Sequence, residues 1–408
     1  MLRFLQCAGR ALMPPAALML AFTVSAALAP AQAANNLGLP TIPLVIQNNS
    51  GDAGKLFVYI TGLVPQDGNK AYYVSATNGD VTIVPKADQP VSLALDLGRT
   101  QVARLNLPQM TALRIYMSFR KPVVVTATAE GAPPSSPPGW VPDDPNYGVL
   151  FDFAEFTWTA HDNTIGGNAT QVDMFGLAML LALKGKDDHG QPVIRRAGFN
   201  DPEARTKIFA ALNDAGPPWK RLVIGSRRII APYHGIPLGR FGQNQLNAYI
   251  NAVWTKYRTQ TLQATTEGRN YTGKVTGGRL VFEEVGGSET FSFAKPTTME
   301  AYQNALTPDP NPPGPGAGAR ARAVAAMLSG AFMRTTLLLN RNLIDDRAAC
   351  KVRQFYTDSP VNVYAKTFHE FALRKLAYSF GFDDTCQQSS FVQVHDPESL
   401  RIIIQPLQ

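Results

Sequence analysis

Short apolar segments separated by turn residues fill the first third of the chain and constrain its fold more than any other feature. They cover residues 44–47, 55–62, 71–75, 81–84, 91–95, 101–107, 113–118 and 122–127. No long helical repeat interrupts this series. Closely spaced short strands are typical of β-sandwiches and β-barrels, so the pattern predicts an all-β unit here.

The pattern changes after residue 170, where helical and strand-like segments mix. A helix over 201–213 is expected, because Pro202 suits the first helical turn. A hairpin is expected over 271–284, around Gly277 and Gly278. Further helices are expected over 242–260, 321–340 and 362–378, and a last strand over 400–407. Loops rich in proline separate these regions at 133–145 and 307–318.

Composition places the chain among folded proteins. Its 408 residues are 45% hydrophobic and 17% charged, which excludes a disordered polyelectrolyte and a highly charged coiled coil. The net charge is +7, from 38 basic and 31 acidic residues. These basic residues are dispersed, without the interleaved aromatic stripe of a nucleic-acid surface, so no nucleic-acid partner is expected.

The first 33 residues have the pattern of a secretory signal. Arg3 and Arg10 precede an apolar run, which ends in a small-residue cleavage motif, Ala31-Gln32-Ala33. A membrane anchor is the alternative, but Pro14 and Pro15 interrupt the run and no charged stop-transfer flank follows. We therefore expect a secreted protein, extracellular or periplasmic, with no membrane span after cleavage. Loss of the two arginines lowers the net charge from +7 to +5.

Two cysteines remain after this segment, Cys350 and Cys386. In an oxidising compartment they could pair, and closing the loop between them would stabilise the fold by roughly 3 to 4 kcal/mol. Two buried free thiols are the alternative, and the sequence leaves both open.

The sequence lacks complete versions of several common catalytic motifs. The run from Gly268 to Lys274 has the spacing of a phosphate-binding loop, but Val275 replaces the required hydroxyl residue and a hairpin follows. The five histidines are scattered and lack metal-ligand spacing. No metal or organic cofactor is therefore expected.

A pair of carboxylates remains as the best candidate chemistry. In the segment 151–159, alternation places Glu155 on one face with Phe151, Phe153, Thr157 and Thr159. Apolar surroundings would favour the protonated form of Glu155, as a general acid requires.

Asp173 follows Glu155 by 18 positions, across a polar turn that contains glycine. Two adjacent strands could therefore bring these acids to one groove. Glycoside hydrolysis uses such a pair, one carboxyl as proton donor and the other to activate water or attack directly.

The residues around this pair resemble a known family. Glu155-Phe156-Thr157-Trp158, followed by 170–175 (Thr-Gln-Val-Asp-Met-Phe), is similar to the catalytic region of glycoside hydrolase family 64 β-1,3-glucanases. The opening 42–49, the segment 228–235, and the tail segments 360–370 and 377–384 carry the resemblance in the same order. It covers most of the chain after the signal.

The resemblance implies a β-rich multidomain fold: a thaumatin-like β-sandwich or barrel with a mixed α/β domain, which together form a wide groove. The expected regions are a signal peptide over 1–33, the barrel over 36–174, the mixed α/β domain over 175–345, and a segment over 346–408 that returns to the barrel.

The implied activity is inverting, endo-type cleavage of β-1,3-glucan to short oligosaccharides by a monomer. Carried over by motif, Glu155 is the general acid and Asp173 the general base. Thr157, Thr159, Thr170, Trp158, Asp383 and Asp384 are expected to bind substrate. Tyr147 and Phe153 are further candidates for stacking on sugars.

This chain also departs from the family pattern. Thr159 replaces a usual Asn, Val363 replaces a usual His, and the turn between the acids is longer and lacks an expected Trp. These changes bear on substrate contacts more than on the acid pair. Two rival hypotheses follow: a non-catalytic β-glucan-binding protein on the same scaffold, and a surface structural protein with a vestigial groove.

Overall fold

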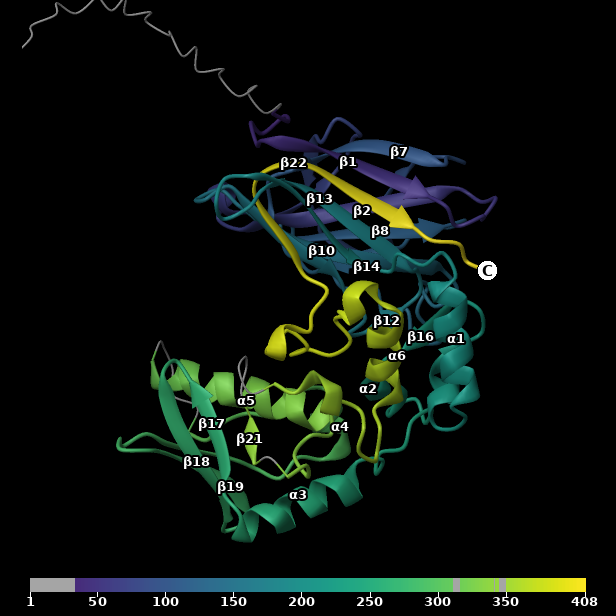
Figure 1. The fold of residues 1–408 in the computed structure, drawn as a ribbon. Helices are drawn as coiled ribbons and strands as arrows, with labels where there is room; N and C mark the ends of the chain where they lie inside the picture. Colours follow the sequence, from purple (N-terminus) through teal and green to yellow (C-terminus); the bar gives the residue numbers. More distant parts are fainter. Residues whose placement is uncertain (1–33, 311–315, 341, 345–349) are drawn as a thin grey trace, which may run out of the picture. The chain divides into compact units, whose positions relative to one another are not determined.

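The strand that carries Glu155 lies inside a large sheet of twelve strands (Figure 1). The computed structural model describes residues 34–310, 316–340, 342–344 and 350–408. The expected signal peptide, 1–33, lies outside these described residues. The sheet path is β14-β13-β22-β11-β10-β8-β2-β3-β4, while β1, β6 and β7 pair beside it.

The strands of this sheet come from both ends of the chain. They are β1 (Thr41–Asn48), β2 (Leu56–Val64), β3 (Lys70–Val74), β4 (Val81–Ile83), β6 (Leu95–Asp96), β7 (Val102–Pro108), β8 (Thr111–Phe119), β10 (Leu150–Thr159), β11 (Thr164–Ala169), β13 (Met179–Lys186), β14 (Pro192–Gly198) and β22 (Val392–Ile404). Both β13 and β14 follow residue 174, so the sheet extends past the domain boundary expected there. β22, from the C-terminal segment, lies between β13 and β11.

Alternation within β10 explains how the sheet forms its core. Ala154, Phe156 and Trp158 are buried in the apolar cluster under the sheet, whereas Glu155 and Thr157 point to the other face. The period of two predicted from the sequence is confirmed. This alternation leaves the polar face of β10 free for a site.

Three smaller sheets accompany the large one. β5 (Ala87–Val91) pairs with β9 (Val125–Ala127), and β12 (Met174–Phe175), β16 (Arg228–Ile230) and β15 (Val223–Ile224) form a second small sheet. The third has the order β20 (Thr290–Phe293), β19 (Arg279–Glu284), β18 (Arg269–Thr276), β17 (Leu262–Thr266) and β21 (Leu343–Ile344). β18 and β19 confirm the expected hairpin.

Helices accumulate after residue 200, as expected. They are α1 (Ala204–Asp214), α2 (Pro232–Gly235), α3 (Asn247–Thr259), α4 (Thr298–Tyr302), α5 (Ala317–Met333) and α6 (Val363–Phe371). Their buried side chains join those of the smaller sheets in one apolar cluster that runs from Phe175 to Phe380. The mixture of helices with short strands agrees with the predicted α/β region.

Some expected elements have different bounds. No strand covers 91–95, because Val91 ends β5 and Leu95 begins β6, and these two strands belong to different sheets. α5 ends at Met333, just before Thr335 adopts a left-handed backbone. α6 ends at Phe371, because Ala372 is extended and the next turn contains left-handed residues.

The two cysteines form a disulfide, which decides the question left open by the sequence. Cys350 and Cys386 have Cα atoms 5.7 Å apart and close a separation of 36 residues. The bond ties the start of the last described segment to the loop that precedes β22.

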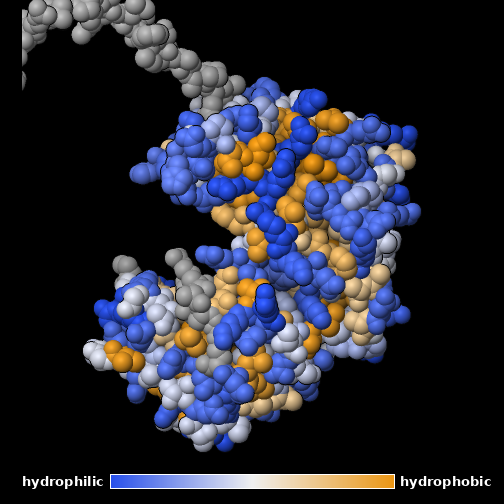
Figure 2. Space-filling model, in the orientation of Figure 1, coloured by the Kyte–Doolittle hydropathy of each residue, from blue (hydrophilic) through white to orange (hydrophobic). Residues whose placement is uncertain are grey.

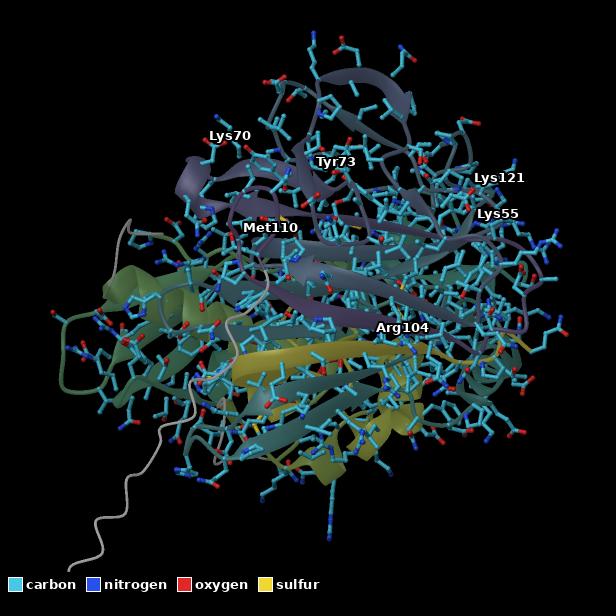
Figure 3. The ribbon with its side chains drawn as sticks, turned by 90° about the horizontal axis from the view of Figure 1, so that it is seen from above. Lys55, Lys70, Tyr73, Arg104, Met110 and Lys121 are labelled. Carbon is cyan, nitrogen blue, oxygen red and sulfur yellow. A yellow bond between two sulfur atoms is a disulfide. The ribbon has the colours of Figure 1, made fainter. Side chains whose placement is uncertain are left out.

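Basic side chains are spread over the surface. In Figure 3, Lys70 lies on one side of the molecule, and Lys55 and Lys121 lie on the opposite side. Lys55 and Lys70 form ion pairs with Asp96 and Asp67. On the face in Figure 2, hydrophilic side chains predominate and hydrophobic ones form separate patches. The positive net charge is therefore partly balanced locally.

Candidate active site

Glu155 occupies the centre of a row of side chains that crosses three strands. It lies opposite Arg114 on β8 and Asn168 on β11. Arg114 Nε donates a hydrogen bond to Glu155 Oε1 over 3.0 Å, and the Glu155 side chain is 35% exposed. The prediction of apolar surroundings for Glu155 is wrong, because Arg114 binds its carboxylate.

A cavity of about 630 Å³ opens over this row. Its lining includes Ala112, Arg114, Glu155, Thr157, Thr159, Asp162, Thr164, Gly166, Asn168, Phe391 and Gln393. Three predicted site residues, Glu155, Thr157 and Thr159, therefore share one cavity. Thr159 Oγ1 donates to the backbone oxygen of Thr164 over 3.1 Å, and the exposed Thr157 accepts a bond from the Ala112 backbone at 3.4 Å.

Asp173 lies just before β12, where two smaller elements hold it. Its backbone oxygen accepts a hydrogen bond from the Ala231 N–H at 2.9 Å, next to α2. Tyr233 Oη and His234 Nε2 both donate to Asp173 Oδ1, the latter over 2.9 Å. Burial opposes ionisation of Asp173, but these hydrogen bonds outweigh it and hold its pKa below the usual value.

His234 is itself fixed by aromatic contacts. Its ring stacks on Trp140 with centroids 3.7 Å apart, and the Tyr233 ring lies 3.9 Å away on a tilted plane. Trp140 comes from the proline-rich loop 133–145. The loop therefore supports the His234 ring, which donates a hydrogen bond to Asp173.

Arg114 connects the two acids electrostatically. It pairs with Glu155, and its charge also helps to lower the pKa of Asp173. Asp173 does not belong to the lining of the 630 Å³ cavity, although this shared arginine relates the two carboxyls. Proximity to Glu155 and Tyr116 raises the pKa of Arg114 despite its partial burial, so it stays charged.

Three side chains that the sequence predicts to bind substrate are buried in the structure. Trp158 is 1% exposed on the core side of β10, and its Nε1 donates to Asn163 Oδ1 at 2.9 Å. Thr170 is also buried, and its hydroxyl accepts the Val172 N–H at 3.1 Å within the turn. Asp383 is 0% exposed.

The other two aromatic candidates, Phe153 and Tyr147, also contact neighbouring side chains. Phe153 is buried against Tyr116 beneath the Arg114 guanidinium. The Arg227 guanidinium lies 5.6 Å from the centre of the Tyr147 ring. Neither ring lines the cavity around Glu155.

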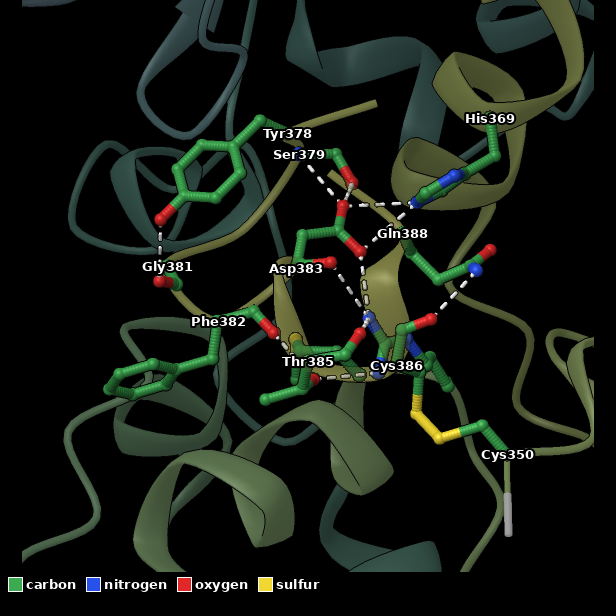
Figure 4. Close-up of polar contacts among 12 residues, drawn as sticks. Cys350, His369, Tyr378, Ser379, Gly381, Phe382, Asp383, Thr385, Cys386 and Gln388 are labelled. Atoms are coloured by element: carbon green, nitrogen blue, oxygen red, sulfur yellow. Dashed lines mark hydrogen bonds and ion pairs between the residues drawn. A yellow bond between two sulfur atoms is a disulfide. The ribbon is translucent and has the colours of Figure 1, made fainter. Parts of the chain in front are cut away.

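Figure 4 shows the polar contacts that hold the buried Asp383. Its carboxylate accepts hydrogen bonds from His369 Nε2 at 3.0 Å and from the Ser379 N–H at 2.9 Å. Arg334 lies 3.1 Å away. Asp383 thus holds the C-terminal loop, while its neighbour Asp384 is exposed and has no described contact with the cavity.

Asp152, a third carboxylate, on the same strand as Glu155, faces the interior. Its Oδ2 accepts the N–H groups of Gly176 and Leu177 at 2.7 and 3.0 Å, and its Oδ1 accepts that of Phe153. Burial raises the pKa of Asp152 to about 7. The side chain joins β10 to the segment that follows Asp173.

Sequence reasoning missed Arg114, Tyr233 and His234. Arg114 is the one charged residue in the strand segment 113–118, which could have marked it as functional. Tyr233 and His234 lie in a segment that carried the family resemblance, yet no role was assigned to them. Their contact with Asp173 joins residues 60 and 61 positions apart, which no local pattern reveals.

Other kinds of site find less support. Within the described residues, no three His, Cys, Asp or Glu side chains group in a way that would suit a metal ion. None of the helices in this part of the chain has the length and apolarity that a bilayer crossing needs.

Comparison with known proteins agrees with the arrangement of these elements. The family model described as "Beta-1,3-glucanase" matches residues 40–404. A glucan endo-1,3-beta-glucosidase from Cellulosimicrobium cellulans is 30% identical over 384 residues, which are 90% of this chain and 65% of that protein. The chain thus spans somewhat less than two thirds of this relative.

Solved structures are similar as well. The crystal structure of a laminaripentaose-producing β-1,3-glucanase in complex with laminaritetraose matches with a TM-score of 0.76 and 27% identity, over 90% of this chain and 99% of that one. A β-1,3-glucanase domain from Clostridium beijerinckii, 24% identical with a TM-score of 0.71, matches 89% of this chain and 98% of its own and shares the fold. With the family match across nearly all described residues, the chain belongs to the glycoside hydrolase family 64 β-1,3-glucanases.

Proposed function

We propose that the protein is a secreted glycoside hydrolase that acts as a monomer. It cleaves linear β-1,3-glucan within the chain and releases short oligosaccharides. Glu155 protonates the departing glycosidic oxygen, and Asp173 activates the water that attacks from the opposite side of the sugar. Direct displacement by this water inverts the configuration at the anomeric carbon.

One observation carries this assignment: each carboxyl is held by one oxygen only. Arg114 binds Glu155 Oε1, and Tyr233 and His234 bind Asp173 Oδ1. Among the described residues, Glu155 Oε2 and Asp173 Oδ2 accept no hydrogen bond. Both acids are therefore fixed in orientation, with one oxygen left for substrate or water.

The electrostatics suit a base at Asp173. Hydrogen bonds that lower its pKa keep it ionised, and an ionised carboxylate can take a proton from water. Glu155 lies beside Arg114, whose Nε–H donates to one of its oxygens, while its other oxygen is left for the glycosidic oxygen of the substrate.

Two features support secretion, the N-terminal sequence pattern and the disulfide. The sequence from Arg3 to Ala33 has the pattern of a cleaved signal, and the Cys350–Cys386 disulfide is of a kind that persists in oxidising compartments.

Substitution of each acid tests the proposal. Glu155→Gln and Asp173→Asn should each reduce release of reducing sugar from linear β-1,3-glucan by at least about a thousandfold, while thermal unfolding stays close to that of the wild type. Asp88→Asn, at an exposed ion pair, is a matched control that should keep full activity. Near-normal turnover in either acid variant would refute the role of that residue.

The stereochemistry and the products test the finer points. Proton NMR during early digestion should detect the α-anomer first, because inversion converts the β-linkage. Product sizing should reveal short oligosaccharides of more than one glucose unit. Early appearance of the β-anomer would instead require a retaining mechanism.

The same assay separates the alternative, a non-catalytic β-glucan-binding protein. Binding of linear glucan by the wild type without any release of reducing sugar would favour that alternative. Failure to bind any glucan would favour a structural protein.

A further inference from the structure

Phe391 presents an aromatic ring inside the candidate active site without an assigned role. It lines the cavity that contains Glu155, and it is 50% exposed. The next residue, Val392, is buried, so alternation places Phe391 on the cavity face together with Gln393. An exposed phenylalanine alone is ordinary, but this ring lies among the polar side chains of the candidate site.

The strand register locates this ring relative to Glu155. Thr157 lies opposite Gly166, and Gly166 lies opposite Gln393. This row is two residues along β10 from Glu155, which corresponds to about 7 Å. The Phe391 ring reaches this row because its Cζ end lies against Gly166.

Gly166 makes room for the ring. A Cβ atom added at Gly166 would lie 2.5 Å from Phe391 Cζ and 3.2 and 3.4 Å from two neighbouring ring carbons. The Cζ end of the ring thus lies against the backbone of β11 at Gly166. The side chain is exposed, yet its position is defined.

Polar groups surround the ring at hydrogen-bonding positions. Thr157 and Gln393 lie in the row of Gly166, and Asn168 lies opposite Glu155 in the next row of the same face. The buried Asn168 Oδ1 has no hydrogen-bond partner among the described residues. A pyranose ring has apolar C–H faces and a rim of hydroxyls, and this combination of ring and polar groups matches it.

We propose that Phe391 forms a sugar-stacking platform beside Glu155, on which one glucose ring of the β-1,3-glucan rests, while Thr157, Asn168 and Gln393 bind its hydroxyls. The inference rests on the proposed function for the identity of the sugar chain. Phe391 is a substrate-binding residue, and its ring contributes through area and stacking.

Binding of laminarihexaose to Glu155→Gln, measured by calorimetry, tests the platform without turnover. Adding Phe391→Ala or Phe391→Leu should weaken binding about tenfold, whereas Phe391→Trp should retain it. Gly166→Ala should also weaken binding, because the new methyl group displaces the ring. Ile194→Ala is the matched control, since Ile194 is 48% exposed and does not line the cavity.

The outcomes separate this inference from the proposed function. Unchanged binding by both Phe391→Ala and Phe391→Leu would overturn the platform, even if the wild type hydrolyses glucan. Weakened binding by these variants supports the platform, even if the wild type releases no reducing sugar and the hydrolase proposal fails. Absence of laminarihexaose binding by Glu155→Gln and by the wild type would overturn both.

Discussion

Arg114 lies beside one proposed catalytic acid and acts on the other. Its Nε lies 3.0 Å from Glu155 Oε1, and its charge helps to lower the pKa of Asp173. In a bell-shaped pH profile for kcat/KM, the acidic limb reports protonation of the base. The arginine should therefore hold the acidic limb at lower pH.

We predict that Arg114→Met moves the acidic limb to higher pH, because the charge that helps to lower the pKa of Asp173 is lost. The measurement is kcat/KM for linear β-1,3-glucan across pH. Arg195→Met, at an exposed arginine of β14, should leave this limb in place. An acidic limb that stays at its wild-type pH in Arg114→Met would contradict the role of Asp173 as the base.

The pair of His369 and Asp383 shows how a buried acid can serve stability. Burial opposes charge on both side chains, but their mutual attraction wins, so the pKa of His369 is raised above 6.5 and that of Asp383 is lowered below 3.8. The raised pKa contributes stability below 6.5, which is lost as pH rises through the folded value. The lowered pKa contributes above 3.8 and is lost as pH falls.

His369→Gln should therefore cost most between pH 4 and 6.5, by about 3 to 5 kcal/mol in the free energy of unfolding, since it leaves a buried carboxylate with one partner fewer. The difference from wild type should shrink above that range. Urea unfolding at several pH values measures it. A cost that grows steadily up to pH 9 would contradict the charged pair.

Among the elements, a side chain of β10 holds the segment that follows β12. Asp152 accepts the N–H groups of Gly176 and Leu177, which directly follow β12. Asp173 directly precedes the same short strand. The buried carboxylate thereby fixes the position of the proposed base from the opposite face of the strand that carries Glu155.

Asp152→Asn should destabilise the fold by about 1 to 3 kcal/mol, because its amide group would face a backbone N–H. Glucan hydrolysis should also fall, through displacement of Asp173. The pKa of Asp152 is raised to about 7, so the folded state holds its proton more tightly, and this contribution to stability declines from pH 4 to 7. The difference in the free energy of unfolding between wild type and variant should therefore decrease over that range. Urea unfolding measures it, and a difference that increases from pH 4 to 7 would contradict this prediction.

For the whole molecule, strands from both ends of the chain share one sheet. β22 lies between β11 and β13 and pairs in parallel with β1, while the disulfide at Cys386 ties the preceding loop to Cys350. The described residues from Ala34 on belong to one compact unit. The α/β elements thus lie in sequence between β1 and β22, which pair with each other in the large sheet.

We predict a single cooperative thermal transition for the protein, with the calorimetric enthalpy equal to the van't Hoff enthalpy. Differential scanning calorimetry measures both. Reduction of the disulfide should lower the transition temperature without splitting it. Two separate transitions would mean that the barrel and the α/β elements unfold independently.

The sequence by itself determined much of the local structure. Alternation in 151–159 predicted the strand and the shared face of Glu155 and Thr157, and the glycine pair at Gly277 predicted its hairpin. These features follow from backbone periodicity and turn chemistry, which depend on neighbouring residues only. The order of short motifs was also sufficient to predict the family.

Only the tertiary structure decided which side chains reach the site. Trp158 and Asp383 belong to matching motifs, yet one packs in the core and the other neutralises buried cations. Arg114 and His234, which hold the two acids, come from strands and loops far away in sequence. Burial and partners are set by contacts between distant segments, so a local pattern can name a reactive residue type but cannot determine its surroundings.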